Sequence, residues 1–308
     1  MRTVTTIVAA IVCALMLFAA GLESASAGQD NQPERVTFLS NDGRTTLVGY
    51  VYKPHTVAKA GFPAVVMMHG RAGAYSSRAD GIYDASTLSM RHKAWGREWA
   101  DAGYIAILVD GFGPRGYPQG FPKGSYDSRP EELSEVTVRP LDAYGALAFL
   151  RLRPDVDPDR IGIQGWSNGG SAAISSMSVE LGGSASSPSK GFRAGLVFYP
   201  ACGLKGQFDV KPFIPYAPTL VFHGTADEEV SFSRCASLVE KGRAAGAEVQ
   251  IKIYSGATHS FDSPTRSRQN VDANAVATVD AVERSLEFFA HNLAARPTAR
   301  SRTRRPTK

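Results

Sequence analysis

Short apolar runs alternate with helical patterns along most of this chain, and no other sequence feature limits the fold so strongly. The run at residues 64–68 (Ala-Val-Val-Met-Met) is typical of a strand buried on both faces of a sheet. Further strands are expected at 104–109, 160–164, 194–199, 219–223 and 248–254, and helices at 87–102, 130–153, 168–177, 231–245 and 274–292. The alternation predicts the α/β class, with a mostly parallel central sheet flanked by helices.

Two alternating, β-branched segments precede the first buried run. Residues 35–40 and 46–52 flank an Asn-Asp-Gly sequence at 41–43, which favours a β-hairpin. The chain is 43% hydrophobic and 20% charged, as is ordinary for a globular protein, and no second composition regime follows. We therefore expect a single domain over residues 28–294.

The first 27 residues have the three parts of a secretory signal peptide. Arg2 is followed by an apolar stretch at 7–20, and Ala-Ser-Ala at 25–27 matches a small-residue cleavage site. The stretch is shorter than the ~20 residues that a membrane-spanning helix needs. We expect cleavage after Ala27, a secreted or periplasmic location and no stable membrane insertion afterwards. An uncleaved membrane anchor is the alternative.

Positive charge is concentrated at the end of the chain. The formal net charge is +5, and residues 296–308 hold six basic residues and no acidic one. Because the rest is nearly neutral, the charge argues against a nucleic-acid partner, which would need Lys and Arg on the fold itself. Residues 295–308 lack apolar periodicity and are expected to be a disordered tail, and the polar segment 182–190 a flexible surface loop.

The sequence Gly-Trp-Ser-Asn-Gly at 165–169 matches the pattern G-x-S-x-G between an expected strand and an expected helix. In that context a serine sits on a sharp turn, exposed at the carboxyl edge of the sheet beside a helix N-terminus. Ser167 is therefore the candidate nucleophile. The alternative is an ordinary glycine-rich turn.

A serine nucleophile needs a base, and in this architecture the order along the chain is serine, acid, histidine. His259 fits, because it follows the expected strand at 248–254 and so reaches the same sheet edge as Ser167. Surface positions are expected for the other histidines at 55, 92 and 291, namely His55, His92 and His291.

The acid should follow the strand between the serine and the histidine. Asp227 follows the strand at 219–223, and we expect it to orient His259 and stabilise its charged form. Glu228 and Glu229 are expected to be solvated carboxylates at a helix start. Asp262 is too close in sequence to His259 to orient it easily.

Two backbone N–H groups should form an oxyanion hole. The residue after the nucleophile, Asn168, supplies one, and the loop after the first buried strand supplies the other. Arg71 is the expected donor in that loop, and its side chain is free to bind an acidic substrate group. His69 before it is also consistent with a hydrogen-bonded structural role.

Removal of the signal peptide would leave two cysteines, Cys202 and Cys235. Cysteines in an oxidising compartment tend to pair, and the topology brings both near one edge of the sheet. We expect a disulfide, with two buried free thiols as the alternative. A cysteine nucleophile is the weakest of the three hypotheses.

Residues 111–116 match the dinucleotide pattern G-x-G-x-x-G after a strand, but Pro114 and Pro118 break the helix that a pyrophosphate needs. We interpret the segment as a loop whose aromatic residues either line an acyl pocket or simply pack: Phe112, Tyr117 and Phe121. No metal or nucleotide motif is present, so the sequence implies no cofactor.

Several motifs together resemble the dienelactone hydrolase family of α/β hydrolases, from about Val36 to Leu293. They are His69-Gly70, residues 109–116, Arg139-x-x-Asp142, residues 165–170, residues 198–202, Gly224-x-x-Asp227-x-x-Val230 and residues 257–261. The resemblance implies the α/β-hydrolase fold and a triad of Ser167, Asp227 and His259. The founding enzymes use a cysteine nucleophile poised by a glutamate, whereas this chain has Ser167, and Met67-Met68 before His69. It therefore resembles the esterase members more closely.

The sequence predicts an exported serine hydrolase that cleaves small-molecule carboxylic esters through an acyl-enzyme. Two alternatives remain open. One is a serine peptidase or acyl-peptide hydrolase, and the other is a catalytically silent binding protein with the same fold.

Overall fold

A computed structural model describes residues 32–295 except residue 59 and residues 180–186. Its strands are β1 (Glu34–Leu39), β2 (Thr46–Tyr52), β3 (Phe62–Met68), β4 (Ile105–Asp110), β5 (Val156–Trp166), β6 (Gly195–Phe198), β7 (Thr219–Gly224) and β8 (Val249–Tyr254). They form one sheet in the order β1-β2-β4-β3-β5-β6-β7-β8. β1 pairs with β2 and β2 with β4 in antiparallel fashion, and the remaining pairs are parallel. The expected hairpin and mostly parallel sheet are confirmed.

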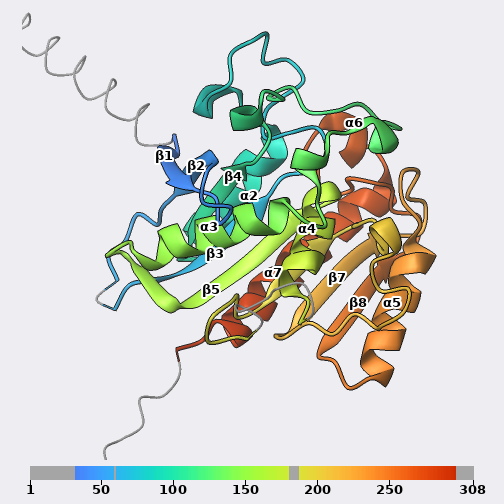
Figure 1. Ribbon diagram of the computed structural model, residues 1–308. Helices are drawn as coiled ribbons and strands as arrows, with labels where there is room; N and C mark the ends of the chain where they lie inside the picture. The colour runs from blue at the N-terminus through green and yellow to red at the C-terminus, as the bar shows by residue number, and fades with distance from the viewer. Residues whose placement is uncertain (1–31, 59, 180–186, 296–308) are drawn as a thin grey trace, which may run out of the picture.

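The main helices are α2 (Met90–Asp101), α3 (Arg139–Arg151), α4 (Asn168–Met177), α5 (Phe232–Ala244), α6 (Arg266–Gln269) and α7 (Asp272–Asn292). Helices α3, α4 and α5 pack on one face of the sheet, and α2 and α7 pack on the other (Figure 1). Side chains of a strand alternate between these two layers: Val66 and Met68 of β3 point to the first, and Val65 and Met67 to the second. Burial on both faces explains the continuous apolar runs, and the fold is that of an α/β hydrolase.

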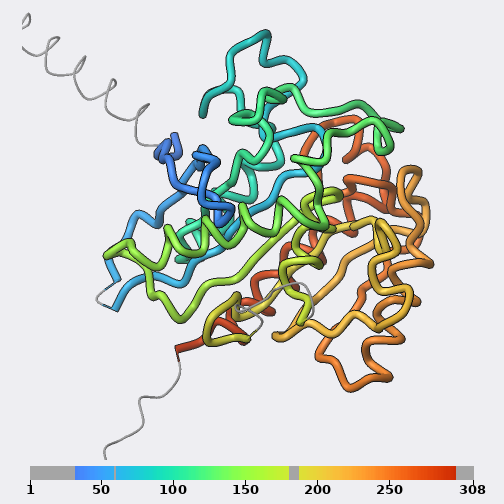
Figure 2. The backbone as a smooth tube through the Cα atoms, viewed as in Figure 1, coloured from blue at the N-terminus to red at the C-terminus, as the bar shows by residue number. Residues whose placement is uncertain are grey.

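The parallel arrangement brings distant segments to one edge of the sheet. Figure 2 follows the chain from the blue strands at one side of the sheet to the orange strands at the other. Strands β3, β5, β6, β7 and β8 are parallel, so the loops that follow them leave from the same edge. Ligand sites of open parallel sheets lie at this carboxyl edge.

The helix expected over 130–153 is shorter than predicted. The structure has a single 3₁₀ turn at Glu131–Leu133, and α3 begins only at Arg139. Pro140 explains the difference, because it has no N–H and its ring collides with the carbonyl four residues earlier. The helix expected over 87–102 likewise begins at Met90, after a 3₁₀ turn at Ala85–Thr87.

Some expectations fall on residues outside the described ranges. These are the leader at 1–27, the basic tail at 296–308 and residues 182–186 of the expected surface loop. Among the residues that the structure describes, none of the helices is both long and apolar enough to cross a membrane.

Candidate active site

Ser167 stands on a sharp turn between β5 and α4. Its backbone has φ 52° and ψ −117°, a conformation that few residues other than glycine adopt. The turn is so tight that a Cβ atom on Gly165 would lie 2.1 Å from the carbonyl oxygen of Gly169, and one on Gly169 would lie 2.0 Å from that of Met68. These contacts explain both glycines of the G-x-S-x-G pattern and hold Ser167 above the sheet edge.

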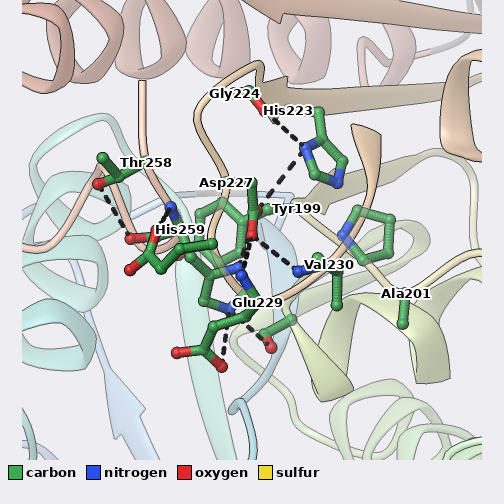
Figure 3. A network of polar contacts seen from close by, with 12 residues as sticks. Tyr199, Ala201, His223, Gly224, Asp227, Glu229, Val230, Thr258 and His259 are labelled. Carbon is green, nitrogen blue, oxygen red and sulfur yellow. Dashed lines mark hydrogen bonds and ion pairs between the residues drawn. The ribbon is translucent and has the colours of Figure 1, made fainter. Parts of the chain in front are cut away.

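His259 connects Ser167 to Asp227. Its Nδ1 atom lies 2.8 Å from Asp227 Oδ2 (Figure 3). Its Nε2 atom lies 3.0 Å from Ser167 Oγ. A carboxylate can only accept, so Nδ1 carries the proton and Nε2 accepts the hydrogen bond of the Ser167 hydroxyl. The structure therefore brings the three predicted residues together in the order that hydroxyl activation requires.

Asp227 is buried and well supplied with donors. Its Oδ1 atom accepts hydrogen bonds of 2.9 Å from the backbone N–H groups of Glu229 and Val230. Burial alone would raise the pKa of this carboxyl, but His259 and the two N–H groups hold it below its usual value. His223 lies 3.7 Å from Asp227 Oδ2, and burial lowers its pKa, so it adds no positive charge here. Asp227 is thus an anion facing His259.

The expectation that Glu228 and Glu229 are solvated is wrong for Glu229. Its side chain is 12% exposed and forms a bidentate ion pair with Arg71, at 2.9 and 2.7 Å. Its carboxylate also lies 3.8 Å from His259 Nε2. Glu228 is more exposed but accepts a 2.9 Å hydrogen bond from the backbone N–H of His259 and pairs with Arg268. Neither carboxylate contacts the Nδ1 atom that Asp227 holds.

The two predicted oxyanion donors lie beside the nucleophile. A Cβ atom placed on Gly70 would be 3.4 Å from Ser167 Cβ, so the loop that holds Arg71 passes directly against the turn. Arg71, Ser167 and Asn168 line the same cavity. No hydrogen bond among the described residues uses the backbone N–H of Arg71 or Asn168. The Arg71 side chain is occupied by Glu229 and the Phe121 carbonyl, so it is not free for an acidic group.

A buried arginine connects the segments that hold the two predicted oxyanion donors. The Nη1 atom of Arg139 donates to the His69 carbonyl at 2.8 Å and to the Asn168 side-chain oxygen. The Asn168 amide in turn donates to Glu135 at 2.8 Å. Burial lowers the pKa of Arg139 to about 10, at which it stays charged at neutral pH. The sequence analysis found Arg139 only as part of a family motif, and Glu135 carried no sequence signal.

His69 has the structural role that the sequence left open. It is fully buried, its Nδ1 atom lies 2.7 Å from the Gly70 carbonyl, and its Nε2 atom accepts from the Gly111 N–H at 3.3 Å. Burial holds its pKa well below the usual value. His92, expected at the surface, is also buried, and its Nδ1 atom lies 2.9 Å from the Ala74 carbonyl. His69 and His92 therefore contact the loop on the two sides of Arg71, the predicted oxyanion donor.

The cavity beside Ser167 has a volume of about 300 Å³. Its wall carries both charges, from Arg71, Lys123, Arg129, Glu135 and Glu229. The aromatic residues of the 111–121 loop do not line it. Phe112 instead packs against His69 and Phe121, with ring centroids 4.5 and 5.6 Å apart. This loop has the packed form, with a 3₁₀ turn at Gly113–Arg115 in place of a dinucleotide-binding helix.

Cys202 and Cys235 form a disulfide that joins the loop after β6 to α5. Cys202 follows Ala201, which lines the cavity, so the bond fixes part of its wall. Within residues 32–295, apart from the undescribed gaps, no group of three or more His, Cys, Asp or Glu side chains is arranged to hold a metal ion.

Comparison with known proteins gives a family match over most of the chain. The dienelactone hydrolase family matches residues 47–293. Esterase 2 of Thermogutta terrifontis, solved as the form phosphorylated by paraoxon, superposes with a TM-score of 0.60 and 22% identity, over 86% of this chain and 96% of that one.

Two curated relatives match shorter shares of their own sequences. Human dipeptidyl peptidase 8 is 24% identical over 268 residues, which is 79% of this chain but 28% of the peptidase. The thiohydrolase aneE of Aspergillus aculeatus is 30% identical over 151 residues, or 47% of this chain and 38% of that protein. This chain therefore spans well under half of the length of either relative.

Proposed function

From the premise that this chain belongs to the dienelactone hydrolase family, we propose that it is a serine hydrolase of small-molecule carboxylic esters. The hydrolase class and the esterase-like fold follow from the family match and the structural neighbour. The proposal adds the nucleophile, the triad and the substrate. The observation that carries it is the pair of hydrogen bonds of His259, at 3.0 Å to Ser167 and 2.8 Å to Asp227.

In the first half-reaction, Ser167 Oγ attacks the ester carbonyl while His259 Nε2 takes the hydroxyl proton. The negative charge that develops on the carbonyl oxygen is stabilised by the backbone N–H groups of Arg71 and Asn168. The C–O bond to the alcohol then breaks, and His259 returns its proton to the leaving alkoxide. An acyl ester on Ser167 remains.

In the second half-reaction, water loses a proton to His259 as it attacks the acyl carbon. The same two N–H groups stabilise the new oxyanion. The bond between the acyl carbon and Ser167 Oγ then breaks, the carboxylic acid leaves, and His259 gives its proton to Oγ, which restores the Ser167 hydroxyl. Asp227 stays ionised throughout, because its pKa is held low. It holds the tautomer of His259 and stabilises the imidazolium.

The size of the cavity supports a small substrate. A volume of about 300 Å³ lies at the lower end of the range for small-molecule pockets. Peptide cleavage is the second candidate, since dipeptidyl peptidase 8 matches 79% of this chain. The catalytically silent alternative is weakened because Ser167, His259 and Asp227 keep the spacing of a working triad.

Labelling with a fluorophosphonate probe, combined with a panel of nitrophenyl esters, thioesters and peptide anilides, tests this proposal. We expect wild type to label and to prefer short-acyl esters, and Ser167→Ala to do neither. Wild type that neither labels nor hydrolyses any ester would overturn it. Preference for peptide anilides would favour the second candidate.

We also propose that the chain acts outside the cytoplasm, because disulfides such as Cys202–Cys235 persist in oxidising compartments. Mass analysis of the protein recovered from a bacterial periplasm or medium tests this. The expected mature N-terminus is Gly28. Recovery of the full-length chain in the cytoplasm alone would overturn it.

A further inference from the structure

A single buried carboxylate, that of Asp262, accepts hydrogen bonds from three separate segments, and a guanidinium lies beside it. Both Trp95 and Trp166 donate their indole N–H to Oδ2 at 2.8 Å. The Tyr199 hydroxyl donates to Oδ1, and Arg91 Nε lies 3.3 Å from the same atom. The Asp262 side chain has no exposed surface. The position of the carboxylate therefore depends on these side chains, and their positions depend on the carboxylate.

Two of the donors, Trp166 and Tyr199, lie next to residues of the proposed triad. Trp166 immediately precedes Ser167 on the sharp turn, and Asp262 follows His259 by three residues. Tyr199 packs its ring edge-on against His259, with centroids 4.7 Å apart. The Asp262 carboxylate thus connects the turn that holds Ser167, the loop that holds His259 and the Tyr199 ring that packs against His259.

The backbone around this carboxylate is held in unfavourable conformations. Ser167, Tyr199 and Ser260 all have positive φ, at 52°, 37° and 60°. Such conformations cost free energy and persist only where surrounding contacts impose them. Asp262 lies two residues after Ser260, and it contacts Trp166, next to Ser167, and Tyr199. It is therefore close to all three strained positions.

The chemistry of the donors requires an acceptor with two oxygens. Indole N–H groups and a guanidinium can only donate. An asparagine at this position would keep one oxygen, and its NH₂ group would face either the two indole N–H groups, which cannot accept, or the side of Tyr199 and Arg91, where only the tyrosine hydroxyl can accept. The Arg91 guanidinium, which lies 5.8 Å from the Tyr199 ring centroid, balances the buried negative charge.

We propose that Asp262 is a positioning residue that fixes the distance between His259 and Ser167. It acts through Trp166, Tyr199 and the His259 loop and does not touch the substrate. The inference rests on the proposed function, since it assigns the Ser167–His259 contact to catalysis. It also gives a role to a carboxylate that is too close in sequence to His259 to orient it easily as the acid.

The test uses Asp262→Asn and Tyr199→Phe in the full chain, with kcat and KM measured on a short-acyl nitrophenyl ester. Near-UV circular dichroism establishes that each variant is folded. A displacement of about 1 Å can cost on the order of 100-fold in rate. We expect D262N to lose about 10- to 100-fold in kcat with KM within about threefold of wild type.

Tyr199→Phe should lose less, and the double variant no more than D262N alone, because both changes break one shared contact. Asp280→Asn is the matched control. Asp280 also accepts from a tyrosine, Tyr254, at 2.9 Å and pairs with Arg284, but lies on α7. We expect its kcat to equal that of wild type, and an equal loss there would overturn the proposal.

A second readout does not depend on turnover. The proton that His259 Nδ1 shares with Asp227 should give a downfield proton resonance, assigned by its absence in His259→Gln. Folded D262N is expected to shift or lose this resonance. A folded D262N with wild-type kcat and resonance overturns the proposal, even if it melts at lower temperature. If D262N does not fold, the same two readouts on Tyr199→Phe decide.

The two proposals fail in distinguishable ways. Wild type without esterase activity or labelling would overturn the proposed function, and the resonance would then decide the positioning role by itself. Active wild type with unaffected D262N would overturn the positioning role alone.

Discussion

Arg71 and Glu229 form a bidentate ion pair, and the carboxylate of Glu229 lies 3.8 Å from Nε2 of His259. Arg71 also carries, on its backbone, one of the two proposed oxyanion donors. The ion pair therefore ties the oxyanion loop to the segment that follows Asp227. At 21% and 12% exposure the two side chains are largely shielded from water, so water and salt screen the attraction between their charges less than they screen a surface salt bridge.

Glu229→Gln is expected to lower kcat by about 3- to 10-fold, because loss of the charged anchor loosens the loop that presents the Arg71 N–H. Steady-state kinetics on a nitrophenyl ester would measure it. Glu34→Gln is the control, since Glu34 pairs with Lys53 at 2.5 Å on half-exposed surface. Wild-type kcat in E229Q would show that the ion pair does not hold the donor.

Asp227→Asn should lower kcat by about 10³- to 10⁴-fold while the protein stays folded. The amide would turn an N–H towards His259 Nδ1 and select the tautomer that cannot accept the Ser167 proton. Single-turnover and steady-state rates would measure the loss. An unchanged rate would transfer the role of the acid to Glu228 or Glu229, the neighbouring carboxylates.

The pH dependence of stability should include a term from His92. Burial lowers its pKa in the folded protein to about 3, well below the ordinary value of 6.5. The unfolded chain therefore takes up a proton between these values that the folded protein does not. His92 therefore contributes to the free energy of unfolding in full above pH 6.5. This contribution falls by about 1.4 kcal/mol for each pH unit below that value.

His92→Asn should remove the contribution of His92 to the pH dependence of the unfolding free energy, whatever the substitution does to stability at pH 7. Urea unfolding at several values between pH 5 and 7 would compare the two slopes. His69, which is buried like His92, remains in both proteins, so a residual slope is expected. Identical slopes in wild type and variant would contradict the prediction.

The positions of Ser167, Asp227 and His259 were accessible from the sequence, because each follows a strand of one parallel sheet and such strands end at the same edge. The G-x-S-x-G pattern and the order serine, acid, histidine then left few candidate residues for each role. The contacts of Asp262 and Glu229 were not accessible. They depend on how side chains from segments as far apart as Trp95 and Asp262 pack, which periodicity does not encode. The late start of α3 was missed although Pro140 marked it.

Removal of the Cys202–Cys235 disulfide should reduce the free energy of unfolding by about 2–4 kcal/mol, because the bond closes a loop across a sequence separation of 33 residues. Urea unfolding of Cys202→Ser/Cys235→Ser would measure the loss. Reduced wild type should behave like the double variant, and the double variant should not respond to reductant. Equal stability of oxidised and reduced wild type would show that the bond adds nothing.

Arg139→Lys should lower kcat by about tenfold with little change in KM, because Nη1 of Arg139 donates to both the His69 carbonyl and the Asn168 side chain, and the lysine side chain is one atom too short to place its ammonium there. The two oxyanion donors would then lose their common support, and a misaligned donor weakens the transition state more than the bound substrate. Arg151→Lys is the matched control on the same helix, since Arg151 also donates to a backbone carbonyl, that of Lys190, at 2.7 Å. Kinetics at a temperature where both variants are folded would separate the effect from stability. Equal kcat in R139K and R151K would mean that Arg139 supports the fold but not the oxyanion hole.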